Sequence, residues 1–157
     1  MVAADTAELL EGGSALIVGV VAPGGEPVAT RGWGLTLVPG GTLRARLLLA
    51  DDDAEALGHL GAGARVAITA ADVPTLRSVQ IKGRSRGLQP ATGDDRVRAA
   101  GYVEAFFGDI VANDGTPRAV LDRVVPRGYV ACDVVVDEVF DQTPGPGAGA
   151  PLAGEGA

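Results

Sequence analysis

The amino-acid sequence predicts a small antiparallel β-barrel with helices packed on its ends, and three observations lead to this fold class. The chain has 157 residues, the size of one domain, and 46% of them are hydrophobic, enough to form a core. Its 24 glycines and 10 prolines indicate many turns and short elements, which excludes a coiled coil or a helical bundle. Short strand-like stretches with interposed helices follow one another between these turns, an order typical of a small barrel.

The first third of the chain predicts a short helix followed by a three-stranded meander. Residues 6–11 form the helix, which Asp5 caps and two glycines end. Strands are expected over residues 14–21, 27–38 and 42–49, and glycine-containing turns join each strand to the next. Strands joined in this way form an antiparallel meander.

A second helix and a pair of strands are expected in the middle of the chain. The aspartates at 51–53 begin the helix, because carboxylates cap and favour a helix N-terminus. Residues 65–69 and 77–86 then form two strands, the second with the alternation of apolar and polar residues that marks a half-buried strand. The side chains of the second helix that are expected to face inward are Ala54, Leu57 and Leu60.

The longest helix is expected to begin at Asp94 and Asp95. One more helical turn follows it, with Thr116 as its cap and Pro117 at its first position. Apolar residues at steps of three and four predict the buried face of the long helix as Val97, Ala100, Val103, Phe107 and Ile110.

A closing strand over residues 129–140 completes the domain, which spans residues 1–141. Residues 142–157 are rich in glycine and proline and contain almost nothing that could be buried, so they are expected to form a flexible tail. In a dimer this tail could cover the pocket of the partner, or it could be plainly disordered.

Charge and cysteine content exclude several classes of function. The formal net charge of −7 disfavours nucleic acid and anionic membranes as partners. The single cysteine, Cys132, allows neither an internal disulfide nor a multi-cysteine metal site. The first residues lack the basic region of a signal peptide, and no apolar run approaches the ~20 residues that a membrane span needs. We therefore expect a cytoplasmic protein with no nucleic-acid or membrane partner.

Catalytic and metal-binding motifs do not identify a reaction. The one histidine, His59, stands on the expected second helix, and no nucleophile elbow or phosphate-binding loop surrounds any serine. Cys132 lies in an apolar strand, where a small buried hydrophobe is the expected role. The aspartates at 51–53 suit capping better than metal binding, because consecutive residues at a helix start point in different directions. We expect no metal site, and the catalytic residues stay unknown.

The strand over residues 77–86 concentrates cationic side chains in an otherwise acidic chain. Such a face suits a phosphate or another small anion, and Gly83 permits close approach. The same alternation also fits an ordinary polar outer face, and both interpretations stay open. The polar face, opposite two apolar side chains, consists of Ser78, Gln80, Lys82 and Arg84.

Cationic residues on neighbouring strands could converge on the same pocket. Arg44 and Arg46 alternate along the third expected strand, and Arg31 lies beside Trp33 on the second. The sequence alone does not show whether they meet.

The order of elements resembles the pyridoxamine 5′-phosphate oxidase-like, flavin-binding split-barrel superfamily over about residues 5–141. The similarity depends on order and spacing together. It is carried by a small apolar run at 14–21, then Gly25-Glu26-Pro27 and a strand with Arg31, then Arg77-Ser78-Val79-Gln80-Ile81-Lys82-Gly83-Arg84-Ser85, a helix with Tyr102 and Phe106-Phe107, and the closing strand at 129–140.

This resemblance implies a homodimer of six-stranded split barrels with short capping helices, and two FMN molecules at the dimer interface. The flavin would make the protein an oxidoreductase that acts on a small-molecule substrate. By position, Arg31 corresponds to the arginine that faces the FMN phosphate, and Ser78 to the polar residue that reaches the flavin from the partner subunit. The other expected cofactor-binding residues are Trp33, Arg46, Gln80, Lys82 and Arg84.

The aspartates at 51–53 depart from the family pattern, which has a basic phosphate clamp at this helix start. Carboxylates repel a phosphate dianion, so either arginines of other strands hold the phosphate or FMN is not the ligand. The alternatives are a barrel without flavin that serves as a binding or structural module, and a barrel with another planar cofactor such as deazaflavin or haem.

Overall fold

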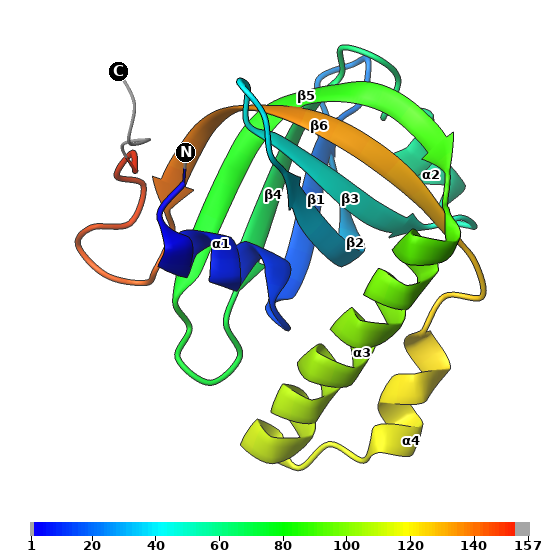
Figure 1. The fold of residues 1–157 in the computed structure, drawn as a ribbon, viewed down its shortest axis with the longest axis vertical. Helices are drawn as coiled ribbons and strands as arrows, with labels where there is room; N and C mark the ends of the chain where they lie inside the picture. Colours follow the sequence, from blue (N-terminus) through cyan, green and yellow to red (C-terminus); the bar gives the residue numbers. More distant parts are fainter. Residues whose placement is uncertain (1, 153–157) are drawn as a thin grey trace.

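A closed barrel of six antiparallel strands forms the centre of the molecule in the computed structural model, which describes residues 2–152 (Figure 1). The strand order around the barrel is β1-β2-β3-β6-β5-β4, and β4 returns to β1. This confirms the predicted six-stranded antiparallel barrel, including the meander and the later strand pair. The strands are β1 (Ala15–Val21), β2 (Pro27–Val38), β3 (Arg44–Ala50), β4 (Arg65–Ala71), β5 (Ser78–Pro90) and β6 (Tyr129–Asp141).

In the described part of the chain, four helices accompany the barrel: α1 (Ala4–Glu11), α2 (Ala54–Gly58), α3 (Gly93–Asp114) and α4 (Arg118–Leu121), the last followed by a 3₁₀ turn (Asp122–Val124). Helix α1 lies across one end of the barrel, whereas the long α3 lies along its side against β2, with α4 beside it (Figure 1). Within residues 2–152, no helix has the length and apolar content needed to cross a membrane.

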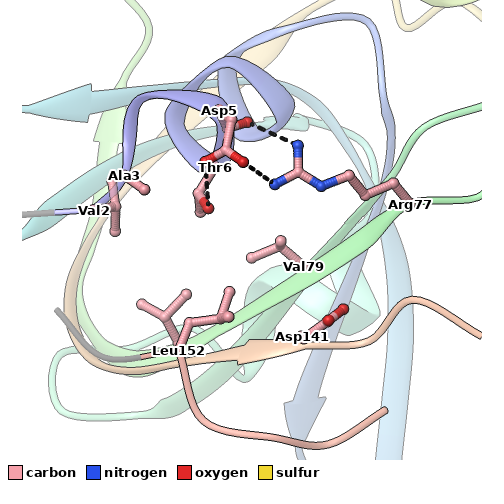
Figure 2. Close-up of a pocket in the computed structure, with 9 residues that line it drawn as sticks. Val2, Ala3, Asp5, Thr6, Arg77, Val79, Asp141 and Leu152 are labelled. Carbon is pink, nitrogen blue, oxygen red and sulfur yellow. Dashed lines mark hydrogen bonds and ion pairs between the residues drawn. The ribbon is translucent and has the colours of Figure 1, made fainter. Parts of the chain in front are cut away.

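Two predicted caps are wrong. Helix α1 begins earlier than expected, with Ala3 at the N-cap, so Asp5 lies inside its first turn and forms an ion pair with Arg77 instead (2.7 Å; Figure 2). Helix α4 has Pro117 at the N-cap position and no side-chain cap, because the hydroxyl of Thr116 donates to the carboxylate of Asp114. In both places the residue that was expected to cap the helix interacts with a nearby side chain: Asp5 with Arg77, and Thr116 with Asp114.

Helix α2 confirms Asp53 as a capping residue and Leu57 and Leu60 as inward residues, whereas the inward position predicted for Ala54 is wrong. The carboxylate of Asp53 accepts the backbone N–H of Ala56 (3.2 Å) and caps the helix. The helix ends at Gly58, sooner than expected, and it buries Ala56 while Ala54 is exposed. Because the helix is so short, the fully buried Leu60 just after its end anchors this segment to the core.

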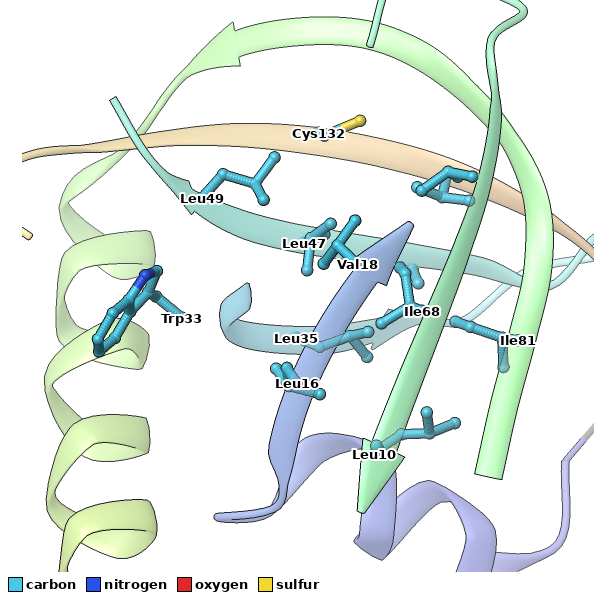
Figure 3. Packing of buried hydrophobic residues seen from close by; sticks show 14 of the residues in the cluster. Leu10, Leu16, Val18, Trp33, Leu35, Leu47, Leu49, Ile68, Ile81 and Cys132 are labelled. Atoms are coloured by element: carbon cyan, nitrogen blue, oxygen red, sulfur yellow. The ribbon is translucent and has the colours of Figure 1, made fainter. Parts of the chain in front are cut away.

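Alternation along the strands fills the barrel with branched aliphatic side chains, because successive strand residues point to opposite faces (Figure 3). Leu16 and Val18 of β1, Leu47 of β3 and Ile68 of β4 are all fully buried. Cys132 of β6 is likewise fully buried and free, as predicted. These side chains occupy the interior of the barrel.

The buried face of α3 differs from the predicted one. Val97 is 74% exposed and Ala100 is also exposed, whereas Val103 and Phe107 are buried as expected. The helix is rotated so that larger aromatic groups meet the barrel, since these bury more apolar area than Val97 or Ala100. The side chains that it buries are Asp95, Ala99, Tyr102, Val103, Phe106 and Phe107.

The hydroxyl of Tyr102 fixes this rotation. It donates to the carbonyl oxygen of Ser14 (2.8 Å) and accepts the backbone N–H of Leu16 (3.3 Å) at the start of β1. Burial raises the pKa of Tyr102 to about 12, so the hydroxyl keeps its proton. Only one rotation of α3 satisfies this buried polar group.

An ion-pair network around Arg46 joins β3, β6 and the start of α3; we call it the Arg46 hub. The guanidinium donates through Nε and Nη2 to both carboxylate oxygens of Asp95 (2.8 and 2.7 Å) and through Nη1 to Asp133 (2.9 Å). Asp95 also forms a capping box with Thr92 at the N-terminus of α3. The hydrogen bonds from Arg46 lower the pKa of Asp95 to about 2.

Residues 142–152 double back along the end of β6. The backbone N–H of Gly149 donates to Asp141 (2.7 Å) and that of Leu152 to Val139 (2.8 Å), and the Leu152 side chain packs on the core. Residues 153–157 lie outside the described part of the chain, and the expected flexibility of the tail stays a prediction.

The pKa of Asp95 predicts a specific acid sensitivity. Its carboxyl is depressed from 3.8 to about 2, so its contribution is complete above pH 4 and is lost as the pH falls toward 2. We expect Asp95→Asn to lower the free energy of unfolding by about 2 kcal/mol at neutral pH, with the difference from wild type shrinking below pH 4. Urea unfolding at a series of pH values measures this. Asp94→Asn, an exposed neighbour, is the control, and a pH-independent difference for Asp95→Asn would contradict the assignment.

Candidate functional site

The outer faces of β2, β1, β4 and β5 form a continuous surface. Ile17 pairs with Arg31 on one side and with Thr69 on the other, and Thr69 pairs with Gln80. One step along the strands, Gly19 and Ala67 continue the same pattern. We call the two rows together the platform: Arg31, Ile17, Thr69 and Gln80, then Ala29, Gly19, Ala67 and Lys82.

Small or apolar residues make up the centre of the platform. A Cβ atom added to Gly19 would have only the carbonyl oxygen of Ala67 within 4 Å, at 3.9 Å, so there is open space above this position. Ile17 is 44% exposed and Val21, at the next outward position of β1, is 52% exposed. An open, partly apolar surface of this kind, the floor of the platform, suits a planar ring system.

Arg31 marks the β2 side of the platform. Its guanidinium lies over the ring of Phe106 on α3, 5.3 Å from the centroid. It is half-buried and has no ion-pair partner among residues 2–152. A cation in this state can accept an anionic group from a ligand.

The β5 side of the platform ends in a pocket of about 320 Å³, which we call the cationic pocket. Arg65 and Arg84 are direct register partners there, and the ammonium of Lys82 lies 4.5 Å from the ring centroid of Phe140. The predicted residues Gln80, Lys82 and Arg84 are thus neighbours, as strand alternation requires. The pocket is lined by Gly19, Val20, Val21, Pro27, Arg65, Val66, Ala67, Lys82, Gly83, Arg84, Asp137 and Glu138.

Sequence reasoning missed Arg65. It opens the strand expected at 65–69, but its position opposite Arg84 depends on the register between this strand and the next one. No local motif encodes that register.

The other predicted site residues lie elsewhere. Trp33 is 4% exposed and packs edge-on against Phe107 of α3. Arg46 belongs to the hub and does not line the cationic pocket. The hydroxyl of Ser78 donates to the carbonyl of Leu76, and its backbone N–H donates to Thr143. The structure therefore does not bring Arg46 together with Lys82 and Arg84.

The N-terminus of α2 is closed to a phosphate by the chain itself. The carboxylate of Asp53 occupies the capping position and also accepts the hydroxyl of Thr30, the neighbour of Arg31. A phosphate dianion there would have to displace this carboxylate or lie against it. The Asp53 carboxylate thus occupies the position where the family pattern has a basic phosphate clamp.

A second pocket, of about 250 Å³, lies between the start of α1 and the ends of β5 and β6 (Figure 2). Its apolar wall includes Val79 and Leu152. Its guanidinium, on Arg77, is already paired with Asp5. Within residues 2–152, no cluster of three histidine, cysteine or acidic side chains could hold a metal ion.

No family model and no curated protein matches this sequence. Solved structures do resemble it. HupZ of Group A Streptococcus has a TM-score of 0.57 at 16% identity over 96% of this chain and 99% of its own. A candidate pyridoxamine 5′-phosphate oxidase of Lactobacillus delbrueckii has a TM-score of 0.54 at 17% identity, over 88% of this chain and 93% of its own.

A third structure comes from Clostridium acetobutylicum, a member of the pyridoxinephosphate oxidase family related to general stress protein 26. It has a TM-score of 0.52 at 12% identity, over 89% of this chain and 87% of its own. At these identities the likeness concerns the backbone arrangement and not the chemistry of the site. Together with the closed six-stranded barrel, it shows that the chain shares the split-barrel fold of these structures.

Proposed function

We propose that the platform binds FMN and that the protein is a flavin-dependent oxidoreductase acting on a small molecule. One observation carries this proposal: the open surface around Gly19 and Ala67 adjoins the cationic pocket with Arg65, Lys82 and Arg84. Two of the similar structures bear the name of a pyridoxamine or pyridoxine phosphate oxidase, which supports a cofactor of this class.

The open part of the platform lies over β1 and β4, next to the cationic pocket. The amide nitrogen of Gln80 donates to the hydroxyl of Thr69 (2.9 Å), which holds the side chain against the floor and leaves its carbonyl for a ligand. A bound flavin would supply hydride or electron transfer, while Gln80 and Lys82 orient its polar edge and Ile17 limits access of water.

A second candidate function is favoured by Asp53, which fills the position of the family's phosphate clamp. In this version the barrel binds another planar cofactor, deazaflavin or haem, or serves as a binding module without one. The visible absorbance of the protein as isolated separates these cases, because flavin, deazaflavin and haem have different spectra and a module without cofactor is colourless.

A second copy of the chain is the proposed partner. Ile17 and Val21 expose apolar side chains on the platform's central strand, and a twofold-related copy would cover them. We also propose the cytoplasm as the location, a reducing compartment that suits the free thiol of Cys132.

Filling the open space at Gly19 tests the cofactor proposal. The leucine of Gly19→Leu would stand on the floor without entering the barrel, and we expect FMN affinity at least tenfold below wild type. Trp33, the only tryptophan, provides the readout, since a nearby flavin quenches its fluorescence. Ala112→Leu, an exposed substitution on α3, is the matched control. Equal FMN affinity in Gly19→Leu and wild type would rule out the platform as the flavin site.

Charging the apolar strand tests the partner. We expect Ile17→Glu to shift the protein from dimer to monomer in light scattering, because a carboxylate cannot be buried in an apolar interface without a partner. Val97→Glu adds the same charge at a position that is 74% exposed on α3 and serves as control. A wild-type protein that is monomeric at high concentration would defeat this proposal.

A further inference from the structure

We propose that Arg65, Lys82 and Arg84 form an anion site that binds the phosphate monoester of the cofactor, in place of the helix start used by the family. This inference rests on the proposed function, because it specifies where the phosphate of that cofactor lies. It also assigns a binding role to Arg65, which no sequence motif identifies.

The register brings the three cations together. Arg65 of β4 pairs directly with Arg84 of β5, and Lys82 precedes Arg84 by two residues, so all three side chains project from the same outer face. All three are exposed and line one pocket of about 320 Å³ beside the platform floor. Gly19 and Ala67 line it too, so the pocket and the floor are continuous.

The two arginines are available, unlike Arg46 and Arg118, which already have carboxylate partners. Arg46 and Arg118 each contact two carboxylates at 2.5–2.9 Å. Arg65 has no ion-pair partner in the part of the chain that the structure describes, and the nearest approach for Arg84 is 3.9 Å, to Asp137. Two guanidinium groups with free N–H donors on adjacent strands provide the forked geometry that phosphate oxygens accept.

The acidic side chains of the pocket set its preference. Asp137 and Glu138 oppose the three cations, which leaves a small positive excess in the pocket. That excess suits one compact dianion better than a long polyanion, and the net charge of −7 repels nucleic acid. Removing the charge of Asp137 should therefore strengthen phosphate binding.

The experiment compares FMN, riboflavin and inorganic phosphate on the intact protein. We expect wild type to bind FMN at least tenfold more tightly than riboflavin. The double variant Arg65→Ala/Arg84→Ala should lose that preference while riboflavin affinity stays unchanged. Asp137→Asn should bind FMN more tightly than wild type. Arg86→Ala, an exposed arginine of the same strand outside the pocket, is the matched control.

The outcomes separate the anion site from the proposed function. If FMN and riboflavin bind equally to wild type and to the double variant, the anion site is wrong and the flavin proposal stands. If neither flavin binds, but inorganic phosphate raises the melting temperature of wild type and not of the double variant, the anion site stands and the flavin proposal is wrong. If Arg31→Ala removes the preference for FMN and the double variant keeps it, the phosphate lies at the other side of the platform and this inference is overturned.

Discussion

The bidentate contact between Arg46 and Asp95 is the interaction on which the arrangement of this protein depends. A barrel closed by backbone hydrogen bonds needs no helix to hold it together, so nothing in the strands alone fixes where α3 lies. The Arg46 hub ties the start of that helix to two barrel strands, and the capping box on Asp95 begins the helix at the same point. The carboxylate of Asp95 thus fixes the start of α3 against β3 and β6.

The placement of α3 in turn shapes the platform. With its start held by the hub and its rotation set by the Tyr102 hydroxyl, the helix presents Phe106 beneath Arg31. Among residues 2–152 this guanidinium has no ion-pair partner, and it lies against the aromatic face instead. Helix α3 therefore covers the β2 side of the platform, while the surface around Gly19 and Ala67 stays open beside the cationic pocket.

Much of the fold could be predicted from the sequence, because its determinants are local. Glycine-rich turns separate runs of β-branched residues, and all six strands lie within a few residues of their predicted ends. The face of α3 could not be predicted, since Val97 fits a helical repeat as well as Tyr102 does and only the partner of the buried hydroxyl decides between them. In the sequence Arg46 is only one cation on a strand, because its partner Asp95 is distant along the chain and meets it in the folded protein. The position of Arg65 opposite Arg84 likewise depends on the strand register, which no short motif encodes.

Gly83 has a consequence for how this surface can change over evolution. It lies at a register shift between β5 and β6, and any side chain there would overlap the carbonyl oxygen of Val135. The barrel therefore keeps a glycine between Lys82 and Arg84, whatever the ligand. During evolution, ligand preference can change through substitution of Lys82, of Arg84 and of Arg65, which pairs with Arg84 on β4. The spacing between these positions stays the same, because Gly83 cannot be replaced. Homologous chains with other cofactors should differ in the charges around an invariant glycine.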